Sequence, residues 1–194
     1  MKSIALLLAP LMMASLSFAN GKYETAVFAG GCFWCVQPVF DHISGVIKSE
    51  AGYANGKEPS PTYEDYTEKG YVEAVRVTYD PQKTTYAILL SEFWKQIDPT
   101  DSEGQFVDRG AQYRPAIFYK DSAQKKTAEN YKAEMQKSGR YNRPLTVEIS
   151  KAENFFAAED YHQDYHKKSP LNYNIYRAGS GRDAYLKKIW LDKK

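Results

Sequence analysis

The sequence has no basic run and no helical stripe of arginine and lysine, so neither nucleic acid nor an anionic membrane is indicated as a partner. The formal net charge is only +2. Internal repeats and low-complexity segments are not visible either. What remains is an ordinary composition, with enough apolar and aromatic residues to bury one core, and this predicts a single domain.

Long hydrophobic runs are also missing. The longest spans residues 4–16, follows a single charge at Lys2, and ends in Ser17-Phe18-Ala19. It is shorter than the ~20 residues of a spanning helix, and a small-x-small ending suits signal peptidase. We therefore expect residues 1–19 to be a cleaved signal peptide, residues 20–194 to be the folded domain, and the protein to be exported. A lipoprotein is not expected, because the first cysteine after the run is Cys32.

Cysteine is scarce, and its placement is informative. The chain has two cysteines, Cys32 and Cys35, in the segment GGCFWC at residues 30–35. Residues 23–28 are typical of a strand, and apolar residues then recur at helical spacing over residues 32–42. The glycines would make the turn and place Cys32 at the helix start, where free N–H groups and the helix dipole favour a thiolate. Cys32 is therefore the candidate nucleophile.

The residue pattern alone leaves other interpretations of these cysteines open. A structural disulfide would close too short a loop to stabilise the chain much. A thioredoxin-type oxidoreductase also places Cys-x-x-Cys at a helix start, and insulin reduction would reveal it. A zinc site with His162 and His166 would need ligands more than a hundred residues apart, which is unusual. A binding module without enzymatic activity would leave Cys32 unexplained.

The rest of the chain alternates strands and helices. Residues 54–68 and 100–110 read as loops, and Ser180 to Asp183 resembles a capping box that opens a last helix to Trp190. Interleaved elements of this kind predict one sheet flanked by helices. We expect strands at residues 46–53, 72–79, 116–119 and 145–149, and helices at residues 84–97, 122–138 with Ser122 as N-cap, and 157–166.

Glu73 is a second candidate catalytic residue. It has the same parity in its strand as Val75, Val77 and Tyr79, so its carboxyl should face the core. A glutamate at the sheet edge that reaches water is the alternative. If Glu73 is desolvated, its pKa rises and it can donate a proton beside a nucleophile.

Three segments resemble the motifs of the peptide methionine sulfoxide reductase A family: GCFWCV at residues 31–36, GYVEAV at 70–75 and DRGAQYR at 108–114. Shorter matching pieces follow in the family's order over nearly the whole chain after residue 20. Gln37 stands where many members have glutamate, and Tyr71-Val72 replaces a frequent His-Ala. Many members also carry a further cysteine near the C-terminus, which this chain lacks.

The resemblance implies a role for each matching residue. Cys32 would take the oxygen from the sulfoxide, and Glu73 would donate a proton to that oxygen. Cys35 would then resolve the oxidised Cys32, because no other thiol exists. The remaining roles fall to pocket residues: oxygen binding to Tyr63 and Tyr113, the apolar wall for the S-methyl group to Phe33 and Trp34, and support of the pocket and substrate backbone to Asp108.

The resemblance also implies the fold and the partners. The fold would be α+β, a mixed sheet packed against helices in two layers, with a long irregular C-terminal segment. The substrates would be oxidised proteins or peptides carrying the S epimer, and electrons would come from a thioredoxin-like thiol donor. We expect no metal, no organic cofactor and no nucleic acid, a monomer, and a periplasmic location.

Overall fold

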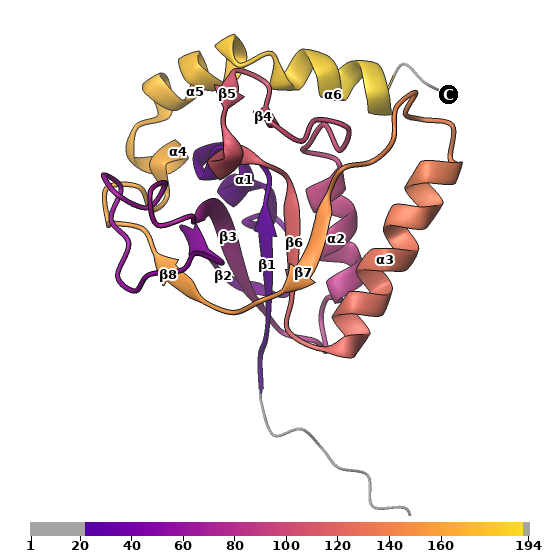
Figure 1. Cartoon of the computed structure of the whole chain (residues 1–194), viewed down its shortest axis with the longest axis horizontal. Helices are drawn as coiled ribbons and strands as arrows, with labels where there is room; N and C mark the ends of the chain where they lie inside the picture. The colour runs from indigo at the N-terminus through magenta and orange to yellow at the C-terminus, as the bar shows by residue number, and fades with distance from the viewer. Residues whose placement is uncertain (1–21, 192–194) are drawn as a thin grey trace, which may run out of the picture.

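A computed structural model describes residues 22–191 and is built on a six-stranded mixed sheet (Figure 1). The strand order is β7-β6-β1-β3-β2-β8, and every neighbouring pair is antiparallel except β6 and β7, which are parallel. The predicted α+β class with a mixed sheet is thereby confirmed. The strands are β1 (Glu24–Ala29), β2 (Val46–Ala54), β3 (Val72–Tyr79), β6 (Ala116–Tyr119), β7 (Glu148–Lys151) and β8 (Phe155–Ala157).

Helices cover one face of the sheet and close one of its ends. The main core lies between the sheet and three helices, α1 (Phe33–Phe40), α2 (Tyr86–Trp94) and α3 (Ser122–Lys137). A smaller apolar cluster lies on the other face. In Figure 1 the C-terminal helices, drawn in yellow, run along one side of the molecule. They are α4 (Tyr165–Lys168), α5 (Pro170–Gly179) and α6 (Arg182–Trp190), beside the short pair β4 (Gly104–Gln105) and β5 (Asp108–Arg109).

The register of β3 places Glu73 on the helix-facing side of the sheet. Val75, Val77 and Tyr79 belong to the main core, whereas Val72 and Ala74 belong to the smaller cluster on the opposite face. Side chains alternate across a strand, so Glu73 shares the face of the first three. Its side chain is 2% exposed, which confirms the core-facing prediction.

The turn between β1 and α1 depends on its two glycines. Gly31 has a φ of +82°, and a Cβ there would lie 2.6 Å from the Gln105 Cβ atom. At Gly30 a Cβ would lie 2.9 Å from a methyl group of Ile97. Left-handed backbone and close approach both favour glycine. The predicted tight turn is confirmed, with Cys32 at the N-cap of α1.

Several boundaries differ from the sequence-based expectations. Asp121, not Ser122, caps α3, because its carboxylate accepts the Gln124 N–H at 2.9 Å. The predicted strand at residues 145–149 begins later, as β7, and residues 100–110 contain the pair β4 and β5. The predicted helix at residues 157–166 was wrong, because β8 ends at residue 157 and turns lead to α4. At α6, Ser180 accepts the Arg182 N–H at 3.2 Å, but Asp183 pairs with Arg177 and completes no capping box.

The predicted signal peptide, residues 1–19, lies outside the described residues. Within residues 22–191, no helix has the length and apolar character needed to cross a membrane.

Gly52 tests how closely β2 and β8 pack. A Cβ at this position would clash with the Phe156 carbonyl oxygen and the Phe155 ring. We expect Gly52→Ala to destabilise the protein by roughly 1–3 kcal/mol, the usual cost of overpacking, in urea unfolding followed by circular dichroism. Gly179→Ala is the matched control, since a Cβ there meets nothing within 4 Å. Equal unfolding midpoints for the two variants would contradict the packing argument.

Candidate active site

A small cavity gathers the residues that the sequence singles out. It holds about 150 Å³ and is lined by the start of α1, by β3, β5 and α5, and by residues of the connecting segments. Cys35 does not line it. The lining residues are Cys32, Phe33, Trp34, Tyr63, Glu73, Asp108, Tyr113 and, in addition to those predicted, Tyr176.

Glu73 is fixed at the floor of this cavity by two hydrogen bonds. One carboxylate oxygen accepts the backbone N–H of Phe33 at 2.9 Å, and the other accepts the Tyr66 hydroxyl at 3.1 Å. Burial raises the pKa of Glu73 to about 8, and these two hydrogen bonds lower it only in part. The side chain is therefore protonated near neutral pH and can donate a proton within the cavity.

Cys32 differs from the expectation of a thiolate. The first amide of α1, on Phe33, donates to Glu73, and the Cys32 side chain makes no capping hydrogen bond. Burial raises the pKa of the Cys32 thiol well above its usual value, and Glu73, once it ionises at higher pH, raises it further. The nearby Tyr176 hydroxyl opposes this shift. Cys32 is thus a thiol in the resting protein, and it must lose its proton as it attacks.

Three phenol groups surround the carboxyl group of Glu73. Tyr63 and Tyr113 line the cavity, as predicted, while Tyr66 lies behind them and is 4% exposed. Burial, followed by the nearby Glu73 charge, raises the pKa of all three. They therefore remain protonated and act as hydrogen-bond donors. Sequence reasoning missed Tyr66 because residues 54–68 read as a loop, in which its spacing from Tyr63 carried no periodic signal.

Residues of the segment after β8 hold Tyr63 and Trp34 of the cavity lining in position. Glu159 accepts the backbone N–H of Tyr63 at 2.9 Å and the Tyr53 hydroxyl at 2.7 Å, so it attaches the Tyr63 loop to β2. His162 is 1% exposed, and its Nδ1 accepts the Trp34 indole N–H at 3.1 Å. Burial lowers the pKa of His162, which keeps Nδ1 free to accept at neutral pH. The indole that forms one wall of the cavity is thereby fixed in orientation.

Asp108 is joined to the C-terminal helices. Its carboxylate accepts the Tyr176 hydroxyl at 2.6 Å, and the same hydroxyl is the one that interacts with Cys32. Tyr176 lies on α5, and the sequence around it has no motif that would mark it as a site residue. Its pKa is raised by burial, so it too is a donor.

Cys35 lies in the first turn of α1, beneath the cavity. Its backbone N–H donates to the Cys32 carbonyl at 3.0 Å, which closes a turn and brings the two residues close together. Both cysteines are reduced, and Cys35 has no exposed surface, against 7% for Cys32. The pair is therefore poised at short range, with only Cys32 reaching the cavity.

Comparison with known proteins identifies the family to which the chain belongs. The family described as peptide methionine sulfoxide reductase matches residues 24–194. The MsrA protein of Bacillus licheniformis is 49% identical over 171 residues, which cover 87% of this chain and 94% of that protein. The chain belongs to the peptide methionine sulfoxide reductase A family. A second relative, MsrA 2 of Caulobacter vibrioides, is 48% identical over 94% of this chain and 93% of its own.

Solved structures of the reductase family agree. Mxr1 of Saccharomyces cerevisiae in reduced form superposes with a TM-score of 0.70 at 31% identity, covering 77% of this chain and 87% of that one. Methionine sulfoxide reductase A of Corynebacterium diphtheriae gives 0.68 at 30% identity, over 79% and 78%. This reductase therefore has peptide-methionine (S)-S-oxide reductase activity and reduces methionine sulfoxide to methionine. The match decides against the thioredoxin-type alternative.

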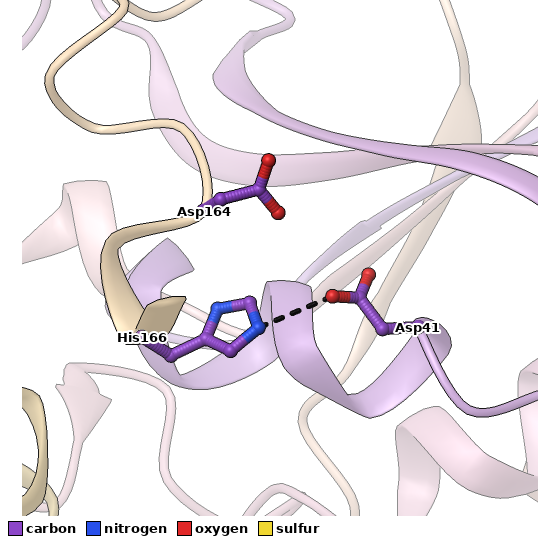
Figure 2. Close-up of side chains that lie close together, drawn as sticks. All are labelled: Asp41, Asp164 and His166. Atoms are coloured by element: carbon purple, nitrogen blue, oxygen red, sulfur yellow. Dashed lines mark ion pairs between the residues drawn. The ribbon is translucent and has the colours of Figure 1, made fainter. Parts of the chain in front are cut away.

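A second cluster of titratable groups lies at the other end of α1 (Figure 2). His166 Nε2 is 3.2 Å from the Asp41 carboxylate, and the Lys167 ammonium lies 2.7 Å from Asp41 and 3.0 Å from Asp164. The lysine supplies the positive charge that these two carboxylates need. We interpret the cluster as an ion-pair network that fastens α4 to the end of α1.

The zinc alternative finds no support in these contacts. His162 Nδ1 is occupied by Trp34, and His166 Nε2 faces Asp41. Within residues 22–191, the one group with three potential metal ligands is Asp41, Asp164 and His166, and it contains no cysteine.

Replacing the Glu73 carboxyl by an amide tests the proton donor. In the wild type, the single-turnover rate should fall as pH rises through about 8, because Glu73 then loses its proton. We expect Glu73→Gln to slow the chemical step on the order of a hundredfold and to remove this high-pH limb. Rapid quench of methionine formation across pH 6–9 measures both. An unchanged rate and profile would assign the proton to a tyrosine instead.

The bond between His162 and Trp34 predicts an effect on substrate affinity. His162→Phe keeps a ring but removes the acceptor, whereas His162→Asn keeps an acceptor near the Nδ1 position. We expect KM for a sulfoxide peptide to rise roughly three- to tenfold in the first variant, the value of one lost hydrogen bond, and less in the second. Steady-state kinetics at pH 7 measures this. An equal KM in both variants would contradict the role of the hydrogen bond.

Proposed function

We propose that this reductase works by a two-cysteine cycle in which Cys32 reduces the substrate and Cys35 resolves the product. The observation that carries the proposal is the single cavity where the Cys32 thiol, the protonated Glu73 and the phenols of Tyr63 and Tyr113 meet. Each group matches one need of sulfoxide reduction: a nucleophile for sulfur, a proton for oxygen, and donors for the charge that develops on oxygen.

In the first step, Cys32 sulfur attacks the sulfoxide and the S–O bond breaks. The oxygen passes to Cys32 as a sulfenic acid, and the product thioether leaves as methionine. Glu73 gives its proton to the oxygen and regains the proton that the Cys32 thiol loses, so no hydrogen is gained or lost overall. Charge grows on the oxygen as sulfur is attacked, so acidic O–H groups aimed at it stabilise the transition state more than the ground state. Phe33 and Trp34 supply the apolar wall for the methyl group, and Asp108 orients Tyr176 beside the nucleophile.

In the second step, Cys35 attacks the sulfenic acid and a disulfide forms with loss of water. The support is positional: Cys35 is the one other cysteine in the sequence, and it lies within the turn that Cys32 opens. Cα atoms joined by such a turn fall within the ~4.4–6.8 Å that a disulfide requires.

A thioredoxin-like dithiol is proposed as the electron donor. A solved structure of Mxr1 from Saccharomyces cerevisiae is a complex with Trx2, and that partnership belongs to the yeast protein. For this chain, the proposal rests on chemistry: a disulfide between Cys32, which lines the cavity, and the buried Cys35 needs a dithiol to restore the two thiols. Oxidised proteins and peptides are the proposed substrates, acted on by a monomer.

Export to a periplasm remains a proposal from the sequence. It is supported by the apolar run at residues 4–16 and the Ser17-Phe18-Ala19 ending. Reduction of methionine sulfoxide restores an apolar side chain, so a repair enzyme suits an oxidising compartment.

One turnover without reductant tests the cysteine cycle. Wild type should form one methionine and lose two hydrogens as a disulfide, seen by intact mass, while Cys32→Ser should be inactive. Cys35→Ser should still form one methionine but accumulate a sulfenic acid that dimedone labels. If Cys35→Ser turned over with thioredoxin as fast as wild type, Cys35 would have no part in the cycle.

A further inference from the structure

Arg182 is a buried cation at the base of the cysteine turn. It is the first residue of α6 and has 0% exposure. Its guanidinium donates to the Gly30 carbonyl at 3.1 Å and to the Gln96 carbonyl, and it lies 4.6 Å from the Phe106 ring centroid. Its side chain thus lies directly under the backbone that presents Cys32.

Among residues 22–191, no carboxylate is in direct contact with Arg182, although its charge acts on the Asp108 carboxyl and opposes the rise in pKa that burial causes there. Within residues 22–191, no ion pair involves Arg182, and its Nε has no hydrogen-bond partner. Burying an unpaired charge is costly, so such groups are normally paired. Arg177 differs: it lies 2.7 Å from Asp183, while another of its N–H groups donates to the Cys35 carbonyl at 3.1 Å.

The charged and titratable groups around Cys35 come from four parts of the chain. Burial raises the pKa of the Cys35 thiol above its usual value, and the charges of Arg182 on α6 and then Arg177 on α5 oppose this rise, to which Asp108 on β5 adds. Tyr173 on α5 and Cys32 also face Cys35. The two arginines are therefore the groups here that favour the ionised sulfur.

We propose that Arg182, assisted by Arg177, is the counter-charge of the Cys35 thiolate formed during the cycle. The inference rests on the proposed two-cysteine cycle and adds a residue to it. Arg182 forms no direct ion pair in the resting protein, and it gains a nearby anion when Cys35 ionises. Arg182 touches no substrate, so it is a positioning residue that acts through Cys35.

The pairing determines the role of each cysteine in both exchange steps: Cys32 is the sulfur that is attacked, and Cys35 is the thiolate that attacks or leaves. In resolution, the Cys35 thiolate attacks the Cys32 sulfenic acid, an S–S bond forms, and the hydroxide that leaves takes the proton lost by Cys35. In reduction, a donor thiolate attacks Cys32, the S–S bond breaks, and Cys35 leaves as a thiolate. The donor's second thiol then releases Cys32, so the dithiol supplies both electrons. A better-stabilised thiolate is the better leaving group.

The exposure of the two cysteines supports the same assignment of roles. Cys32 lines the cavity and is 7% exposed, whereas Cys35 is fully buried and its carbonyl accepts an N–H of Arg177 on α5. A donor reaches Cys32 first, and the sulfur it displaces is the one beside the two arginines.

Single-turnover measurements on three variants test the proposal. Arg182→Met removes the charge, Arg182→Lys keeps it, and Arg177→Gln weakens the pair at a less buried position. After one addition of sulfoxide, methionine formation reports the first step, and disulfide formation in intact mass reports resolution. Arg143→Gln is the control, an arginine whose side chain is 65% exposed. Thermal melting checks that each variant is folded.

We expect Arg182→Met to slow resolution at pH 7 about tenfold or more and to move its pH profile upward by about one unit, while the first step changes less. Arg182→Lys should lie within a few-fold of wild type, and Arg177→Gln should slow resolution in the same direction. A purely structural role would not move the pH profile. If Arg182→Met does not fold, the Arg182→Lys and Arg177→Gln profiles decide.

Two negative outcomes are distinguishable. Wild-type resolution rates and pH profiles in the folded arginine variants, with Cys35→Ser still blocked, would overturn the role of Arg182 and leave the cysteine cycle intact. Wild-type turnover of Cys35→Ser with thioredoxin would overturn the cycle itself.

Discussion

The hydrogen bond from the Phe33 amide to the buried Glu73 carboxyl is the contact on which the site depends. It joins β3 to the first turn of α1, so the distance between proton donor and nucleophile is set by the sheet and the helix together. The same contact uses the helix N-terminus to hold a carboxyl in an apolar core. Glu73 consequently provides its acid function at neutral pH, at a cost in stability.

That cost has a defined pH dependence. The pKa of Glu73 is about 8 in the folded protein, against 4.5 for an unperturbed carboxyl. A raised pKa means that the folded state binds the proton more tightly than the unfolded state. The stability contributed by this group is therefore full below about pH 4.5 and is lost progressively as pH rises to about 8. The phenol of Tyr66 and the Phe33 amide reduce the loss without removing it.

The sequence alone predicted the reacting residues better than the residues that hold them in place. The Gly-Gly-Cys turn and the alternation in β3 are local patterns, so Cys32 and Glu73 could be placed from spacing alone. The roles of Tyr63, Tyr113 and Asp108 needed the family resemblance, because residues in turns carry no periodic signal. Tyr66, His162, Tyr176 and Arg182 were missed as parts of the site. The last three act through partners far away in the sequence, and Tyr66, which bonds to nearby Glu73, lies in a segment that read as a loop. The segment after β8 was also misread as a helix, although the Gln163 amide pairs there with both backbone groups of Ala51.

The bond between Arg182 and the Gly30 carbonyl spans 152 residues. Contacts of such long sequence separation close a large loop and form late, because the entropy of closure must be met before the contact contributes. Strand β1, which leads into the turn of Cys32, and β3, which carries Glu73, can pair while the last helices are still undocked. We therefore expect the cysteine turn to assemble early and to be enclosed last, when α6 docks on a chain whose nucleophile already lies in place.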